Sequence, residues 1–375
     1  MKLDNLQRTV LVIGGGLAGI TAAAVAIKKG AKVTLATSGP GTLAMSGGSI
    51  SSQGIDPKHP CLEKAMGFFT DMMARAGCEY KGEFRDRQLV PNALGSFQEV
   101  SMAPASIWSG SPVKGNKVMV LGIRGLSGFN ANLTAELLTE SAGRRNLPVE
   151  YTGRMIEVPW LQNRGFNTLD LANHLEEQQN RDKLAEIIKP LIKDYSLLLM
   201  PAILGQQIGS TELAQFAEKV GCSVGELNTV PPSVVGLRIS QSLLKYLQKA
   251  GVDINFGYPV QSLQWQAGRC TAAILDTPGR KRIIKADHFI LATGRINKFD
   301  LVINHEGKDT EWDLEETVVN EQMQLLNQDK LPVAANVYGA GSILKGFDCR
   351  NGNALAILTG YQAGIIAAGG ETIEC

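Results

Sequence analysis

The chain has 375 residues, which predicts one large domain or two interleaved domains. Its 37 lysine and arginine residues balance 36 aspartate and glutamate residues, which argues against a nucleic-acid-binding surface and favours a small molecule or another protein as the partner. Six scattered cysteines form no C-x-x-C pair, so no zinc, dithiol or iron-sulfur motif is present and we expect reduced thiols in the cytoplasm.

The chain begins with a predicted strand, helix and strand around a glycine fingerprint. Residues 10–13 form an apolar run typical of a central parallel strand, residues 17–29 have helical composition, and residues 32–37 predict a second strand. Between them the sequence satisfies G-x-G-x-x-G, which allows a tight turn and brings a pyrophosphate to a helix N-terminus. This pattern predicts a dinucleotide site formed by Gly14, Gly15, Gly16, Ala18 and Gly19.

The end of the second strand departs from this fingerprint. Thr37 and Ser38 stand where an acidic residue normally binds ribose, so we expect a weakened or rearranged adenosine contact. The stretch LATSGPGTLAMSGGSISS that contains them, residues 35–52, is rich in glycine and hydroxyl side chains. The small side chains in this stretch leave the backbone accessible, which suggests a loop that fits closely around a ligand.

Later segments predict the rest of the architecture. Residues 61–235 contain helical segments and irregular connectors, whereas strand-like sequence returns at 253–256, 260–265, 271–275 and 288–292. The predicted fold class is therefore α/β, with a discontinuous Rossmann-like FAD-binding domain of the two-dinucleotide-binding flavoprotein type and an inserted α+β cap domain. We expect the first domain at residues 1–60, 236–300 and 330–375, and the cap or partner-binding domain at 61–235.

Two further glycine sites favour a flavin. An apolar strand that ends in Ala292, Thr293 and Gly294 is typical of two-dinucleotide-binding flavoproteins, in which a second glycine-bearing segment passes close to the cofactor. The alternative is a plain glycine between a strand and a loop. The later segment YGAGSILKGFDCRNGNAL would aim a helix N-terminus at the flavin pyrimidine and stabilise negative charge on the reduced ring. The remaining predicted cofactor contacts in these regions are Val260, Gly341, Ser342, Asn353 and Ala354.

Several segments together resemble a known family over nearly the whole chain. They are GGGLAG, MSGGSIS, GIRGLSGFN, LLMPAILG, PPSVVGLRISQSLLKYLQKAG, ILATG and GAGSILKGFD. They resemble the B subunit of anaerobic glycerol-3-phosphate dehydrogenase, within the wider fumarate-reductase-like flavoproteins. The resemblance implies a flavoprotein that works with a catalytic FAD subunit and an iron-sulfur subunit in anaerobic respiration, passing electrons toward quinone.

The same resemblance bears on cofactor and location. FMN is the flavin named for this family, but the intact fingerprint favours FAD, because FMN has no pyrophosphate for the glycine turn. The chain would be cytoplasmic and would reach the inner face of the membrane only through its partners. It is shorter than is usual for the family, and DCRNGNAL lacks the expected glycine run, which leaves the electron donor open.

Similarity to succinate dehydrogenase and fumarate reductase flavoproteins implies that one loop lies beside the flavin ring. The loop comprises Ser46, Gly47, Gly48 and Ser49. The histidine that links flavin covalently in those enzymes aligns with Gly41, so a non-covalent cofactor is expected.

Three basic residues are candidates for a substrate or hydride-transfer site: Arg124, Arg238 and Lys345. The alternative for each is a surface or structural ion pair, and no histidine is assigned as a base. Residues 176–193 predict either a partner-binding helix or a solvated cap helix. Two other functions stay open, a self-sufficient flavin dehydrogenase or reductase that acts on a small carboxylate, and a flavin-free structural subunit.

Overall fold

The computed structural model describes residues 7–161, 165–295, 301–305, 308–312, 317–327 and 329–370. The chain divides into two compact units. Unit 1 contains Met1–Thr42, Gln53–Met72 and Leu243–Cys375, and unit 2 contains Leu43–Ser52 and Met73–Ser242. Each unit is therefore assembled from segments that are far apart in the sequence.

A five-stranded parallel sheet forms the centre of unit 1, in the order β11-β2-β1-β15-β18. Residues 10–13 and 289–291 are buried, which explains why these strands are continuous apolar runs. The sheet joins strands from both ends of the chain, so the predicted discontinuous dinucleotide-binding fold is confirmed. Its strands are β1 (Thr9–Ile13), β2 (Lys32–Thr37), β11 (Asp253–Phe256), β15 (His288–Leu291) and β18 (Val337–Gly339).

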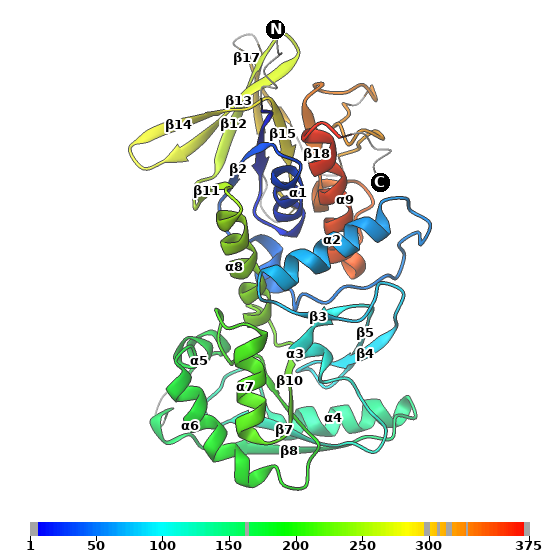
Figure 1. The fold of residues 1–375 in the computed structure, drawn as a ribbon, viewed down its shortest axis with the longest axis vertical. Helices are drawn as coiled ribbons and strands as arrows, with labels where there is room; N and C mark the ends of the chain where they lie inside the picture. The colour runs from blue at the N-terminus through cyan, green and yellow to red at the C-terminus, as the bar shows by residue number, and fades with distance from the viewer. Residues whose placement is uncertain are drawn as a thin grey trace. The chain divides into compact units, whose positions relative to one another are not determined.

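Helices α1 (Leu17–Lys28) and α9 (Gly352–Ala367) lie side by side in unit 1 (Figure 1). Glycines allow their backbones to approach, because a Cβ on Gly360 would lie 2.3 Å from the Ala18 carbonyl oxygen. The N-terminal part of α2 (Leu62–Arg75) contacts α9 through Phe68 and Tyr361, whose ring centroids are 5.6 Å apart. Within the described ranges, no helix has the length and apolar character needed to span a bilayer.

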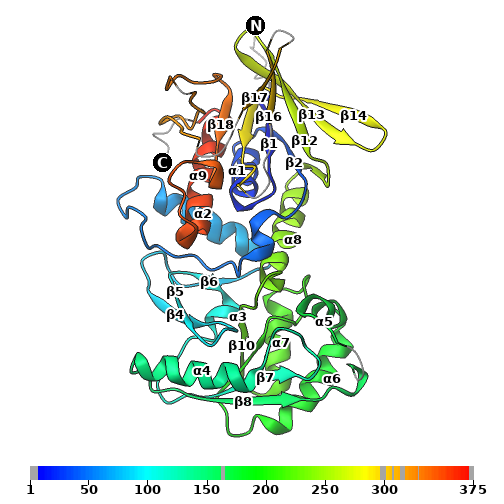
Figure 2. The same cartoon turned by 180° about the vertical axis from the view of Figure 1, so that it is seen from behind.

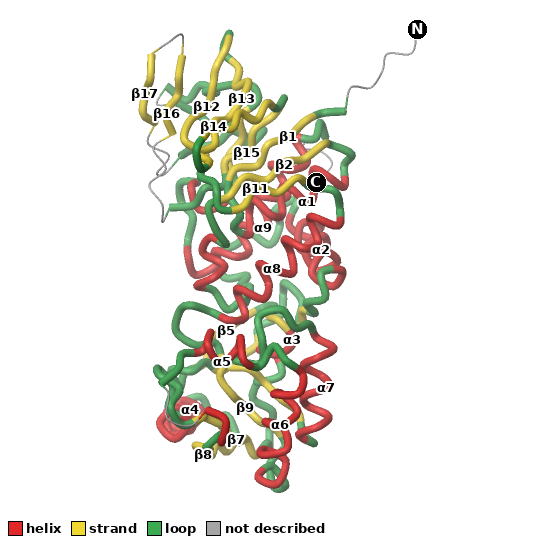
Figure 3. Tube along the Cα trace, turned by 90° about the vertical axis from the view of Figure 1, so that its left-hand side faces the viewer, coloured by secondary structure: helices red, strands yellow, loops and turns green. Residues whose placement is uncertain are grey.

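A second sheet of unit 1 has five strands in the order β14-β13-β12-β16-β17 (Figure 3). Four neighbouring strand pairs hold it together, three antiparallel and one parallel, between β12 and β16. The predicted strands at 260–265 and 271–275 fall within it. Its strands are β12 (Val260–Gln266), β13 (Arg269–Thr277), β14 (Arg280–Lys285), β16 (Leu301–His305) and β17 (Lys308–Trp312).

Unit 2 is built around a four-stranded parallel sheet in the order β10-β9-β7-β8, which the sequence did not predict. Its strands are β7 (Lys117–Ile123), β8 (Glu150–Ile156), β9 (Leu197–Pro201) and β10 (Ser223–Leu227). Helix α4 runs beside β8 (Figure 2). The connecting helices are α4 (Ala131–Arg144), α5 (Thr168–His174), α6 (Gln178–Ile188) and α7 (Ser210–Val220).

Shorter elements complete unit 2. Two small antiparallel sheets pair β3 with β6 and β4 with β5. Helix α8 (Val234–Lys249) begins in this unit, and its residues from Leu243 onward are assigned to unit 1. The remaining elements are β3 (Tyr80–Lys81), β4 (Gln88–Pro91), β5 (Phe97–Val100), β6 (Ala103–Pro104) and α3 (Ala105–Trp108).

Candidate functional site

The carboxyl ends of the parallel strands in unit 1 gather most of the predicted cofactor residues. Residues 14–16 follow β1, residues 292–294 follow β15, and Gly341 comes shortly after β18. From β1 the chain continues to β2 on one side, while β15 lies on the other side. This change of direction makes the edge between β1 and β15 a topological switch point, where open α/β sheets bind ligands.

Three glycines of the fingerprint are required by contacts within the protein. Gly14 has a φ of +118°, and a Cβ there would lie 2.1 Å from the Ala292 carbonyl oxygen. A Cβ on Gly19 would lie 1.9 Å from the Gly14 carbonyl oxygen, and one on Gly15 would lie 2.5 Å from Thr37 Oγ1. These residues let β1, α1 and the segment after β15 approach closely.

Gly16 has no such structural requirement. Its φ of −75° and ψ of 177° suit any residue, and a Cβ there would meet no atom within 4 Å. It is the N-cap of α1, where no side chain caps the helix and no acidic residue occupies the first turn. The helix N-terminus favours an anion. Open space at this point fits a pyrophosphate, and a methyl group on Gly16 would project into that space.

Two buried polar atoms have no hydrogen-bond partner in the described structure, Thr293 Oγ1 shortly after β15 and Asn351 Oδ1 directly before α9. Asn351 is 4% exposed, precedes α9, and donates from Nδ2 to the Gln53 carbonyl oxygen at 2.8 Å. Buried polar groups in native proteins are nearly always paired. Thr293 therefore suits a polar ligand at the carboxyl edge of this sheet, and Asn351 suits one at the start of α9.

The hydroxyl of Thr37, a predicted ribose contact, is hydrogen-bonded within the protein. Thr37 Oγ1 donates to the Gly39 carbonyl oxygen at 2.7 Å and accepts from the Gly39 N–H at 3.2 Å, so its hydroxyl closes a local turn. Ser38 is exposed and Gly41 approaches the fingerprint, since a Cβ on Gly41 would lie 3.2 Å from Gly16 Cα. A larger side chain at position 41 would press on the glycine turn.

The serine-glycine loop predicted beside the flavin belongs to unit 2. Gly47 packs against the Asn228 carboxamide, because a Cβ on Gly47 would lie 2.1 Å from Asn228 Nδ2. The Tyr80 hydroxyl donates to the Gly48 carbonyl oxygen at 2.8 Å, and the Gly48 N–H donates to Ser46 Oγ at 3.1 Å. The predicted cofactor residues are thus distributed over both units, and the loop has a fixed conformation.

The three basic candidates are not gathered at one site. Arg238 is 4% exposed and binds Glu226 in a bidentate ion pair, with Nη1 to Oε2 at 2.7 Å and Nη2 to Oε1 at 3.0 Å. Its Nε and Nη2 also donate to the Gly205 carbonyl oxygen. This buried pairing fits the structural ion pair that was the alternative for Arg238, and a substrate-binding role for this residue stays a prediction.

The other two candidates are exposed. Arg124 Nε lies 3.4 Å from Glu157 Oε1, and both side chains are largely in solvent. Lys345 lies in the turn after η4 (Gly341–Ile343), and only its backbone N–H donation to Thr317, at 2.9 Å, is seen. An exposed ion pair of this kind contributes little to stability. The structure gives neither residue a partner that defines a catalytic role.

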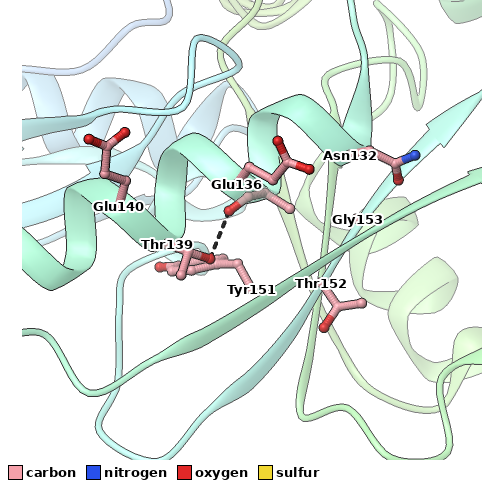
Figure 4. Close-up of a pocket in the computed structure, with 8 residues that line it drawn as sticks. Asn132, Glu136, Thr139, Glu140, Tyr151, Thr152 and Gly153 are labelled. Carbon is pink, nitrogen blue, oxygen red and sulfur yellow. Dashed lines mark hydrogen bonds between the residues drawn. The ribbon is translucent and has the colours of Figure 1, made fainter.

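A surface hollow of about 530 Å³ in unit 2 contains none of the predicted site residues (Figure 4). It lies between α4 and β8, where the Thr139 hydroxyl donates to the Ala135 carbonyl oxygen at 2.8 Å. Glu136 and Glu140 contribute carboxylates to it, and no basic side chain lines it. Its charge is wrong for a pyrophosphate, so the glycine turn of unit 1 is the better cofactor site.

The cysteines depart in one respect from the expected reduced state. Cys61 is disulfide-bonded, whereas Cys78, Cys222 and Cys270 are free thiols. Burial raises the pKa of Cys270 to about 12 and also raises the pKa of Cys78, so both thiols stay protonated at neutral pH. Neither provides the reactive thiolate of a redox centre.

Comparison with known families defines the class of protein. The chain belongs to the pyridine nucleotide-disulphide oxidoreductase family, whose model matches residues 144–354. A second model, FAD binding domain, matches residues 9–60, which include the glycine turn and β2. The protein is therefore an FAD-dependent oxidoreductase, and the FAD prediction is confirmed.

Individual relatives confirm the resemblance drawn from the sequence segments. The chain is 27% identical to the B subunit of the probable anaerobic glycerol-3-phosphate dehydrogenase of Halobacterium salinarum, over 97% of this chain and 98% of that protein. It is 25% identical to the B subunit of the anaerobic glycerol-3-phosphate dehydrogenase of Yersinia enterocolitica, over 82% and 78% of the two chains. Among solved structures, 3-ketosteroid-delta4-(5alpha)-dehydrogenase from Rhodococcus jostii aligns over 98% of each chain with a TM-score of 0.40 and 12% identity.

Proposed function

We propose that this chain is the flavin-bearing subunit of a glycerol-3-phosphate dehydrogenase complex that delivers electrons toward quinone. The similarity to two B subunits, one of them over nearly its full length, supports the substrate and the membership of a complex. The open space at Gly16 supports FAD binding by this chain, because no contact within the described protein requires a glycine at this position. The N-terminus of α1 would hold the FAD pyrophosphate.

Other residues would hold the rest of the cofactor. Thr293 and Asn351 offer unpaired polar atoms, and the N-terminus of α9 supplies a positive dipole end that stabilises negative charge. Bound FAD supplies a two-electron acceptor, while these groups bind it and favour its charged reduced form. With glycine at position 41, the chain makes no histidyl link.

The electrons would leave through a partner subunit. In the described part of the chain, no three His, Cys, Asp or Glu side chains gather as metal ligands. A flavin on this chain would therefore exchange electrons with an iron-sulfur or second flavin subunit. Attachment to the inner face of the cell membrane would also depend on the partners.

Rapid mixing of the FAD-loaded chain with glycerol 3-phosphate, alone and with its co-purified partners, tests this proposal. We expect substrate-dependent bleaching of the flavin only when the catalytic partner is present, and transfer to a quinone analogue only in the full complex. Bleaching of the isolated chain by a small carboxylate or alcohol would favour a self-sufficient enzyme. The buried ion pair between Arg238 and Glu226 argues against the use of Arg238 by this rival to bind a carboxylate.

A further inference from the structure

Helices α1 and α9 of unit 1 pack in parallel, and α9 begins well before the level at which α1 begins. A Cβ on Gly360 would lie 2.3 Å from the Ala18 carbonyl oxygen. One on Gly364 would lie 2.7 Å from the Ala22 carbonyl oxygen, so the two helices run in the same direction. At a helical rise of about 1.5 Å per residue, α9 extends about 12 Å beyond Ala18 between Gly360 and Gly352. Because α1 begins at the carboxyl edge of the sheet, the start of α9 lies on the ligand-binding side of that edge.

Asn351 is the N-cap of α9, but its side chain does not cap the helix. Its Nδ2 donates instead to the Gln53 carbonyl oxygen at 2.8 Å, and a Cβ on Gly54 would lie 3.3 Å from the same nitrogen. Gln53 and Gly54 also belong to unit 1. These contacts fix the carboxamide, so Oδ1 is held on the side away from residues 53–54.

The Oδ1 acceptor of Asn351 is buried and has no hydrogen-bond partner among the described residues. The residue is only 4% exposed, and a buried acceptor without a donor is unfavourable. No acidic side chain occupies the first turn of α9, and a first helical turn leaves backbone N–H groups without acceptors inside the helix. The start of α9 thus combines one acceptor with a positive helix end, which is complementary to a ligand that carries an N–H beside a carbonyl oxygen.

We infer that Asn351 is a specificity residue for the flavin, whose Oδ1 accepts a hydrogen bond from the N3–H of the pyrimidine ring. The inference rests on the proposed binding of FAD at the glycine turn of unit 1. The flavin pyrimidine carries N3–H between its carbonyl groups, whereas the pyrophosphate, the ribityl chain and adenine offer no N–H beside a carbonyl oxygen. The ribityl chain spans a distance of the order that separates the two helix N-termini. Asn351 would therefore select the ring end of the cofactor.

Two substitutions separate this role from a purely structural one. Asn351→Ala and Asn351→Asp both lose the donor to the Gln53 carbonyl oxygen, but aspartate keeps an acceptor at the Oδ1 position. Three probes are titrated into the full apoprotein: FAD, 3-methyl-FAD, which has no N3–H, and ADP, which has no flavin ring.

In the wild-type chain we expect FAD to bind about tenfold more tightly than 3-methyl-FAD, because the analogue leaves Oδ1 unpaired. Asn351→Asp should keep this preference. Asn351→Ala should bind FAD about tenfold more weakly than the wild type and show no preference, with an unchanged affinity for ADP. Gly16→Ala is the matched control, since it should weaken FAD and ADP alike and retain the preference for FAD over the analogue.

Equal binding of FAD and 3-methyl-FAD by the wild-type chain would overturn the inference. So would an Asn351→Ala variant that keeps the wild-type preference, or that loses affinity for ADP in parallel with FAD, because Asn351 would then have a structural role only. Should Asn351→Ala fail to fold, Asn351→Leu, which keeps the volume without an acceptor, decides by the same criteria. A wild-type chain that binds neither FAD nor ADP would contradict the proposed function and, with it, the inference.

Discussion

Substitution of Gly16 by alanine separates a ligand-binding glycine from a structural one. The new methyl group meets no protein atom within 4 Å and the backbone angles are ordinary, so the folded chain accommodates it. Alanine at an N-cap costs about 0.5–1 kcal/mol relative to glycine, and the stiffer unfolded chain offsets about 0.4–1 kcal/mol. The free energy of unfolding should therefore change by less than about 1 kcal/mol.

FAD affinity should respond much more strongly. The methyl group would occupy the space at the N-terminus of α1 where the pyrophosphate approaches. Loss of one hydrogen bond to a charged group costs about 1.5–3 kcal/mol, which weakens FAD binding by roughly tenfold to a hundredfold. Titration of the apoprotein with FAD, followed by flavin fluorescence, measures this change.

Two other glycines are the controls for this experiment. Gly67 lies within α2 with open space around it, so Gly67→Ala should stabilise the fold by about 0.5–1 kcal/mol and leave FAD binding unchanged. Gly14→Ala should lose the fold as well as the cofactor, because of its positive φ and the 2.1 Å approach to Ala292. An unchanged FAD affinity in Gly16→Ala would refute the claim that the space at Gly16 holds the FAD pyrophosphate.

Three further predictions concern the fold. Gly360→Ala should destabilise unit 1 by about 2–4 kcal/mol, seen as a lower urea midpoint, because the backbones of α1 and α9 would be forced apart. Arg238→Met should lower the free energy of unfolding by about 3–5 kcal/mol, because it leaves the Glu226 carboxylate buried and unpaired. Adding Glu226→Leu should restore most of this stability. Equal losses in the single and double variants would contradict this explanation. Burial lowers the pKa of His288 below 6.5, and Arg8 contributes to this shift, so the unfolded chain binds the proton more readily than the folded chain. The melting temperature should therefore fall as the pH drops below about 6.5. In His288→Phe it should fall less steeply.

The first βαβ unit could be predicted because its signals are local. Strand, glycine turn and helix follow one another within residues 9–28, and Gly14 and Gly19 meet across a single turn. The role of each glycine can therefore be inferred from its immediate neighbours in the sequence. The carboxyl edge of the sheet could also be predicted as the binding edge, because the later apolar runs indicate buried parallel strands.

The parts that were missed depend on long-range contacts. Strand β9, LLLMP, directly follows a charged helical region, and a short apolar run does not distinguish a buried strand from a helix end. Arg238 lies on α8 and Glu226 on β10, and only the tertiary fold joins them. Similarly, the packing of Gly47 on Asn228 places residues 43–52 in unit 2, a contact that no local pattern indicates.

The most direct test of the central claim is the identity and amount of flavin released from the purified chain. The chain would be reconstituted with an equimolar mixture of FAD and FMN, freed of unbound flavin and denatured in acid. We expect about one FAD per chain in the supernatant and little FMN, with no flavin left on the polypeptide. Release of FMN alone, or of no flavin, would contradict the assignment of the glycine turn to a pyrophosphate.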